Sequence, residues 1–240
     1  MSDQLRINKN NFIDQTIRLS FKFNGKKLFG YKGDTLASAL LANNIHLVGR
    51  SFKYHRPRGI MTCGSEEPNA ICQINDKSSL TEPNVRATEI ELYEGLEANS
   101  QNCWPSVQFD IGGINNLISP FIPAGFYYKT FMWPKSFWKS VYEPLIRKTA
   151  GLGKSPIKPD PEIYDHKHVH CDVLVIGGGI SGIISAKLSA KNNLNTILID
   201  DKKELGGSTI FQDNEIFKIN NKISKDWFCL LYTSPSPRDS

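Results

Sequence analysis

The residues with the clearest chemical potential form a glycine-rich turn of the pattern GxGxxG, made of Gly177, Gly178, Gly179, Ile180, Ser181 and Gly182. A continuous apolar run, Val173 to Ile176, precedes the turn and is typical of a parallel strand buried on both faces. The small residues from Ile183 to Ala190 then predict a helix. Such a turn suits dinucleotide phosphates, because its glycines admit them and the helix N-terminus offers N–H groups.

An acidic residue follows the next apolar run at the spacing that a dinucleotide site requires. Asn195 to Ile199 predict a second strand that ends at Asp200, 18 positions after Gly182. A carboxylate there accepts hydrogen bonds from the ribose hydroxyls and disfavours a 2′-phosphate, so NAD or FAD is favoured over NADP. Asp201 is the neighbouring candidate for this role. The alternative is a glycine-rich turn in some other α/β fold.

The N-terminal part predicts a separate, mixed domain. Two runs of alternating apolar residues flank Asn24-Gly25, a pair that favours a tight hairpin because both residues tolerate positive φ. The order of elements expected after it is that of a β-grasp, ferredoxin-like domain. These elements are a helix from the N-cap Asp34 to Asn43-Asn44, and strands over Ala70–Ile74 and Val85–Tyr93.

The chain is therefore expected to combine an α+β domain with an α/β domain. The second is a truncated, Rossmann-like βαβ domain that binds FAD or NAD(P). Five segments are predicted: a polar arm over 1–16, the β-grasp domain over 17–98, an aromatic and proline-rich connection with a linker over 99–165, the start of the dinucleotide-binding domain over 166–228, and a non-native tail over 229–240.

Composition excludes several classes of protein. The 240 residues are 40% hydrophobic, enough for a core, and their net charge of +5 is too small to argue for nucleic acid binding. No apolar stretch approaches the length of a transmembrane helix, and the polar N-terminus contains no secretory signal. Five cysteines, an odd number, fit a reducing compartment, so we expect a cytoplasmic protein that is not bound to membranes.

Several stretches closely resemble the α subunits of heterotetrameric sarcosine oxidases, in the same order over about residues 17–210. They begin at Gly33 (GDTLASALLANNIHLVGRSFKYHRPRGIMTCGSEEPNA), Asn84 (NVRATEIELYEG), Ser119 (SPFIPAGFYYKTFMWP), Tyr142 (YEPLIRKTAGLG) and His170 (HCDVLVIGGG). The resemblance implies oxidative demethylation of sarcosine to glycine, with oxygen reduced to hydrogen peroxide. The one-carbon unit would leave as formaldehyde or pass to tetrahydrofolate.

The same resemblance implies cofactors and partners. Amine oxidation would take place at a flavin on the β subunit, the complex would hold FAD and FMN, and γ and δ subunits would complete it. The α subunit would bind NAD and, through a C-terminal domain, tetrahydrofolate. Gly177, Gly179, Gly182 and Asp200 would contact NAD, and Gly207, in the Glu204-Leu205-Gly206-Gly207 turn, would lie near it. No catalytic residue is expected in this chain.

The sequence departs from that family after about Asp226. The last residues, Leu230 to Ser240 (LLYTSPSPRDS), resemble translated sequencing-adapter sequence, so we expect an N-terminal fragment with an artefactual tail. A natural disordered terminus is the alternative.

A ferredoxin-like domain raises the question of an iron–sulfur cluster. A plant-type cluster needs C-x4-C-x2-C and a fourth cysteine. Counting from Cys63, the other positions hold Pro68, Ile71 and Thr88, so no cluster is expected. A clusterless domain would serve for docking. The alternatives are an amino-acid or opine dehydrogenase subunit that carries a cluster, and a non-catalytic docking module.

Four other groups of residues have types and spacings that could serve a function. His166, His168 and His170 alternate and could ligate zinc, but an approach to the first strand is the preferred interpretation, and no metal site is predicted. The basic run from Arg50 to Arg58 could bind nucleic acid, but contacts with a partner domain or with cofactor phosphates are favoured. The aromatic span from Phe126 to Trp138 is expected to pack between domains or on a subunit. The Glu66-Glu67 pair predicts a solvated turn.

Overall fold

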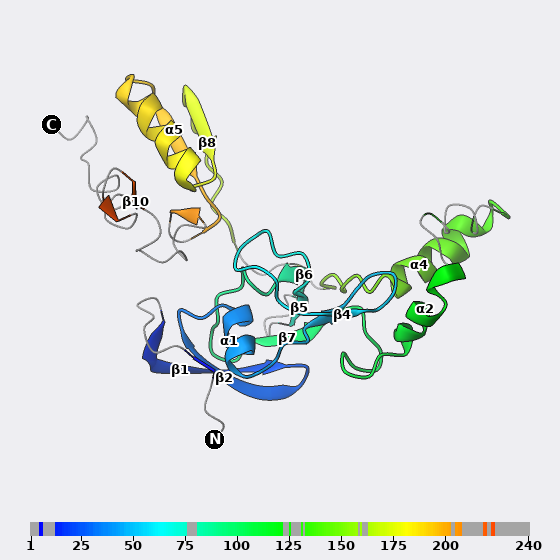
Figure 1. Cartoon of the computed structure of the whole chain (residues 1–240). Coiled ribbons are helices and arrows are strands. Elements are labelled where there is room, and N and C mark those ends of the chain that lie inside the picture. Colours follow the sequence, from blue (N-terminus) through cyan, green and yellow to red (C-terminus); the bar gives the residue numbers. More distant parts are fainter. Residues whose placement is uncertain are drawn as a thin grey trace. The chain divides into compact units, whose positions relative to one another are not determined.

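The computed structural model describes residues 5–6, 13–75, 81–121, 125, 131, 133–157, 159, 163–202, 205–207, 218–219 and 222–223. The chain divides into two compact units, residues 1–162 and 163–240. Figure 1 shows the helices and strands of each unit.

A five-stranded mixed sheet organises the first unit. Its spatial order is β2-β1-β7-β5-β6, in which β1 and β7 are parallel and the other neighbours are antiparallel. The strands are β1 (Asp14–Phe23), β2 (Lys26–Lys32), β5 (Ile71–Asn75), β6 (Thr81–Arg86) and β7 (Glu97–Ser100). A separate antiparallel pair consists of the two-residue strands β3 (Gly49–Arg50) and β4 (Pro57–Arg58).

The hairpin predicted at Asn24-Gly25 is confirmed. The two residues connect β1 to β2 with φ angles of 51° and 77°, and Phe23 pairs with Lys26. These positive angles are the ones that a tight, strand-connecting turn requires. Strand β1 begins at Asp14, within the range 1–16 that was predicted as a polar arm. The last residues of that range therefore belong to the sheet.

Helix α1 (Leu36–Ala42) begins one residue later than predicted. Its N-cap is Thr35, whose hydroxyl accepts from the N–H of Ser38 while the Ser38 hydroxyl accepts from that of Thr35. Asp34, which was predicted to be the cap, is instead buried. Its carboxylate accepts both guanidinium nitrogens of Arg6, at 3.0 and 2.6 Å, together with the N–H of Tyr31. The early chain is thus tied to the domain.

Loss of the ion pair between Arg6 and Asp34 should destabilise the first unit. Substituting Arg6 with alanine leaves the buried Asp34 carboxyl group without its guanidinium partner, and we expect the free energy of unfolding to fall by about 3 kcal/mol. Chemical denaturation of the variant measures this. Lys26→Ala, which removes an exposed cation from β2, is the matched control and should change stability by less than about 0.5 kcal/mol. Equal stability of the Arg6→Ala variant and the parent would contradict the role of the ion pair.

The strand predicted over Val85–Tyr93 is wrong, because β6 ends at Arg86. The residues after Arg86 lie against the beginning of α1. There the carbonyls of Ala87 and Ile90 accept hydrogen bonds from the N–H groups of Ala37 and Leu36, which have no partner within the helix. The apolar residues in this stretch therefore pack around a helix end. The strand that completes the sheet is β7, which the sequence analysis did not predict.

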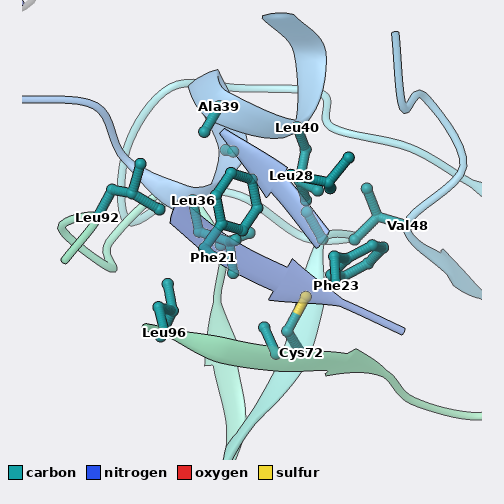
Figure 2. Packing of buried hydrophobic residues seen from close by; sticks show 14 of the residues in the cluster. Phe21, Phe23, Leu28, Leu36, Ala39, Leu40, Val48, Cys72, Leu92 and Leu96 are labelled. Atoms are coloured by element: carbon teal, nitrogen blue, oxygen red, sulfur yellow. The ribbon is translucent and has the colours of Figure 1, made fainter. Parts of the chain in front are cut away.

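The core of the first unit lies between α1 and the sheet (Figure 2). Phe21 and Leu28 from the hairpin meet Leu36 and Leu40 from the helix, and all four are at most 5% exposed. Cys72 of β5 lies in the same cluster. The alternating apolar residues of β1 and the helically spaced apolar residues of α1 thus pack together in one layer.

Short helices follow the sheet. They are η1 (Ile111–Gly113), α2 (Ile114–Leu117), η2 (Ser119–Phe121), the π-helix η3 (Trp138–Tyr142) and α4 (Glu143–Thr149). Of the aromatic span, Phe131 and Phe137 pack near Tyr142, whereas Trp133 is 83% exposed. Phe126, Tyr127 and Tyr128 lie outside the described residues.

The second unit contains the predicted strand–helix–strand arrangement. Strands β8 (Val173–Ile176) and β9 (Thr196–Ile199) are parallel and in register, and α5 (Ile180–Lys191) connects them. The short strands β10 (Lys218–Ile219) and β11 (Lys222–Ile223) form a separate pair. The prediction that β8 is buried on both faces is wrong for the described residues. Leu174 and Ile176 are 52% and 77% exposed, because only α5 covers the two-stranded sheet.

Candidate dinucleotide site

The glycine-rich turn joins β8 to α5 at the carboxyl end of the strand. Gly177 has a φ of +102°, in the region that favours glycine, and its N–H donates to the carbonyl of Ile199 at 2.8 Å. A Cβ on Gly182 would collide with the Gly177 carbonyl, so only glycine allows α5 to approach the strand this closely. Gly177 thus permits the tight turn from strand to helix, and Gly182 permits close packing of the helix on the strand.

Asp200 lies at the end of β9, and its carboxylate reaches back to the same turn. One carboxylate oxygen accepts the N–H of Gly178, and the other accepts that of Lys202 at 2.7 Å. These backbone hydrogen bonds, that of Gly178 first, hold the pKa of Asp200 below its usual value. The structure therefore brings an ionised carboxylate to the middle of the motif.

A third segment, which contains Gly206 and Gly207, also contacts the glycine turn. The N–H of Gly206 donates to the carbonyl of Gly178 at 2.7 Å, and Gly206 forms a parallel bridge with Gly179. Gly207, with a φ of +56°, would place a Cβ 3.1 Å from the Cα of Gly179. Glu204 of this turn lies outside the described residues.

The outer side of the turn is open. A Cβ built on Gly179 would meet no described atom within 4 Å. Gly179 is also the N-cap of α5, and no described side chain caps this helix end. The positive end of this helix therefore has space beside Gly179 that no described side chain fills, an arrangement that suits phosphate oxygens.

The remaining predicted site residues lie around this opening. Ile180 and Ser181 form the first turn of α5, with Ser181 exposed. The side chain of Asp201 is 83% exposed and lies 4.0 Å from the Lys202 ammonium, whereas that of Asp200 is bonded into the turn. Asp201 is thus mostly exposed, and Asp200 is the carboxylate that is joined to the glycines.

Two cysteines of the first unit lie in different surroundings. Cys63 is exposed and Cys72 is buried in the core, where burial raises the pKa of its thiol to about 12. Cluster ligands are thiolates. No group of three or more His, Cys, Asp or Glu side chains is placed to hold a metal among the described residues, and this also applies to His166, His168 and His170.

The loop before β5 is organised by a carboxylate. Glu67 is 1% exposed, and its two oxygens accept the N–H groups of Met61, Thr62, Asn69 and Ala70 at 2.6–3.1 Å. Burial alone would raise the pKa of Glu67, but these hydrogen bonds outweigh it and the pKa lies below its usual value. The predicted solvated turn is therefore wrong for Glu67 and holds only for the exposed Glu66.

The cysteines give a direct chemical prediction. Iodoacetamide at pH 8 should alkylate Cys63 and leave Cys72 unmodified in the folded protein, because thiolate is the reactive form. Peptide mass mapping before and after unfolding in guanidinium measures this. Rapid labelling of Cys72 in the folded protein would contradict its place in the core.

Within the described ranges, no helix is both long enough and apolar enough to cross a bilayer.

Comparisons with known proteins agree with the two units. Residues 17–103 match the family described as "2Fe-2S iron-sulfur cluster binding domain", and residues 172–217 match "FAD dependent oxidoreductase". The chain is 51% identical to sarcosine oxidase subunit alpha of Rhizobium meliloti (strain 1021) over 222 residues, which are 92% of this chain and 22% of that protein. Over this segment the chain is similar to the sarcosine oxidase alpha subunits.

Two further comparisons extend this relationship. Sarcosine oxidase subunit alpha of Corynebacterium sp. (strain U-96) is 29% identical over 82% of this chain and 16% of its own length. The chain thus spans about a fifth of the alpha subunits that it matches. Among solved structures, L-proline dehydrogenase from P. horikoshii matches 91% of this chain and 31% of its own, with a TM-score of 0.50 and 21% identity, and shares the fold.

Proposed function

We propose that this chain works within a sarcosine oxidase alpha subunit and that its second unit binds NAD. In this proposal the first unit is a β-grasp domain and the second is part of a Rossmann-like domain. The observation that carries it is the ionised Asp200 held on the glycine turn beside an open helix N-terminus. The 51% identity to an alpha subunit supports the enzyme assignment.

The residues fit a dinucleotide at each part of the turn. Backbone N–H groups at the start of α5 would donate to the pyrophosphate oxygens, and Gly179 would leave room for them. The Asp200 carboxylate would orient the ribose hydroxyls and would repel a 2′-phosphate. Bound NAD can supply a hydride acceptor.

The proposed reaction is that of the whole complex. Sarcosine would be oxidatively demethylated to glycine with formation of hydrogen peroxide, and the one-carbon unit would be released or passed to tetrahydrofolate. Amine oxidation would occur on the β subunit, with FAD and FMN in the complex and γ and δ subunits as further partners. The names of the related alpha subunits support this assignment. The free cysteines of the described residues support a cytoplasmic location.

We further propose that the first unit holds no cluster and acts in docking. Support comes from the buried position of Cys72. It also comes from Glu67, whose carboxylate accepts N–H groups of the loop that contains Cys63. A cluster-carrying subunit of an amino-acid dehydrogenase is the second candidate, favoured by the match of residues 17–103 to a 2Fe-2S domain family. Iron and acid-labile sulfide in protein purified without oxygen would select that candidate.

A pair of neighbouring substitutions tests the NAD site. Asp200→Asn should weaken NAD binding by about tenfold and reduce the preference for NAD over NADP, because the charge that repels the 2′-phosphate is lost. Asp201→Asn is the matched control, since that side chain is mostly exposed. Equilibrium dialysis with both nucleotides measures the effect. Equal losses in the two variants would count against Asp200 as the ribose ligand.

A further inference from the structure

A cleft of about 450 Å³ in the first unit is lined by cations. Its walls include Arg50, Lys53, Arg56 and Arg58, and none of the described residues that line it is Asp or Glu. The cleft is therefore a site of positive potential that attracts anions. The four cations come from the loop that joins β3 to β4 and from the ends of these strands.

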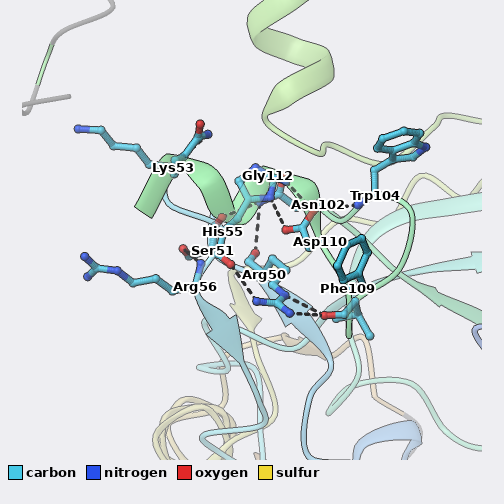
Figure 3. Close-up of polar contacts among 12 residues, drawn as sticks. Arg50, Ser51, Lys53, His55, Arg56, Asn102, Trp104, Phe109, Asp110 and Gly112 are labelled. Atoms are coloured by element: carbon cyan, nitrogen blue, oxygen red, sulfur yellow. Dashed lines mark hydrogen bonds and ion pairs between the residues drawn. The ribbon is translucent and has the colours of Figure 1, made fainter. Parts of the chain in front are cut away.

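Arg50 anchors this loop. Its guanidinium Nε donates to the carbonyl of Val107 at 2.8 Å, and a terminal nitrogen donates to the carbonyl of His55 at 3.2 Å (Figure 3). These acceptors are neutral carbonyl groups, so no ion pair is formed through these bonds. The loop is thereby fixed to the segment around Val107, which is itself buried.

A buried His–Asp pair provides a second anchor. Nδ1 of His55 lies 2.7 Å from a carboxylate oxygen of Asp110, and the other oxygen accepts the N–H of Trp104 at 3.0 Å. The His55 ring packs on Gly112 so closely that a Cβ there would collide with it. The basic loop is thus preorganised, which lowers the entropy cost of binding a ligand.

The other cations project away from these anchors. Figure 3 shows the side chains of Lys53 and Arg56 extending from the loop on the side away from Arg50 and Asp110. Both lie against the Tyr54 ring, at 4.9 and 4.8 Å from its centre. In the part of the chain that the structure describes, the exposed Arg58 guanidinium has no hydrogen-bonding partner.

The lining also offers an apolar ring. Phe52 is 61% exposed, although its neighbours on the loop are anchored. The lining also includes Asn69 and Asn84. An exposed aromatic ring next to cations binds a planar base by stacking while the cations bind phosphate, and the cleft volume lies in the range of small-ligand sites.

We propose that this cleft binds a nucleotide, with its phosphates on Arg56 and Arg58 and its base on Phe52. An acidic polypeptide would use the cations but would leave the Phe52 ring without a partner, so the nucleotide explains more of the lining. The site lies wholly in the first unit and is separate from the glycine turn. The phosphate could belong to a free mononucleotide or to one half of a dinucleotide.

Calorimetric titration of ADP tests this site, with the whole chain carrying Gly179→Ala so that the glycine turn contributes little. Adding Arg56→Ala and Arg58→Ala should weaken ADP binding at least about tenfold. Adding Phe52→Ala alone should weaken ADP binding by about tenfold and leave pyrophosphate binding unchanged. Lys26→Ala with Lys32→Ala removes two exposed cations from β2 and should have no effect.

The outcomes separate the alternatives. Equal losses in the β2 control would show general attraction by charge and overturn the site. Unchanged ADP binding in the double arginine variant, or tighter binding of tetraglutamate than of ADP, would also overturn it. Titration with NAD in place of ADP distinguishes the two sources of the phosphate, because a dinucleotide site would bind NAD more tightly than ADP.

Discussion

Replacing Glu67 with alanine should lower the free energy of unfolding by about 4 kcal/mol. The carboxylate accepts four backbone N–H groups of its own loop, and its 1% exposure leaves no water to replace it. Alanine would leave these donors buried without acceptors, each of which costs about 1 kcal/mol or more. Glu66→Ala is the matched control and should be nearly neutral, because that neighbour is exposed. Chemical denaturation of both variants measures the difference.

The same carboxylate should make stability depend on pH. The pKa of Glu67 is lower in the folded protein than its usual value, so its contribution is complete above that usual value. The contribution is then lost as the pH falls through the lowered pKa of the folded state. The stability gap between the parent and Glu67→Gln should therefore narrow as the solution is acidified below about pH 4.5. A gap that stays constant from pH 7 to pH 3 would show that the charge of Glu67 is not what stabilises the loop.

Replacing Gly179 with alanine should abolish most dinucleotide binding without harming the fold. Its φ and ψ of −71° and −179° are open to any residue, and a Cβ there meets no described atom within 4 Å. The free protein should therefore tolerate the methyl group. In the complex the methyl would occupy the space of the pyrophosphate, and we expect a loss of about 3 kcal/mol, or about 100-fold in dissociation constant.

Two control variants show whether a loss of NAD binding is specific to Gly179. Gly113→Ala, at another uncrowded helix-capping glycine, should change neither stability nor binding. Gly182→Ala should weaken binding and also destabilise the second unit, because its Cβ would collide with the Gly177 carbonyl. Thermal melts and NAD titrations on the three variants give the comparison. Normal NAD affinity in Gly179→Ala would mean that the ligand does not bind over this turn.

The parts that sequence predicted well are those specified by local chemistry. Asn24-Gly25 forms the expected hairpin, because its positive φ angles depend on two adjacent residues. The strand, glycine turn and helix that begin at Val173 were likewise predictable. The steric limits that require glycine there are set by residues only a few positions away in the sequence. Asp200 was found by its spacing, and the structure places its carboxylate on the turn.

The parts that sequence missed depend on contacts between distant residues. Asp34 looked like a helix cap, but Arg6, 28 positions earlier, captures its carboxylate and Thr35 takes the capping role. Glu67 looked like a solvated residue, because nothing in the spacing of its neighbours shows that the loop turns its N–H groups inward. Strand β7 pairs in parallel with β1, more than 70 residues away, and its four residues carry no clear alternation.

The most direct test of the account is the affinity of the purified protein for dinucleotides, measured by equilibrium dialysis against NAD, NADP and FAD at the same salt concentration. The account predicts that NAD binds, that NADP binds at least about tenfold more weakly, and that Gly179→Ala removes NAD binding. Binding of FAD with no binding of NAD would contradict the proposal that this unit is an NAD site. Equal binding of NAD and NADP would contradict the role given to Asp200.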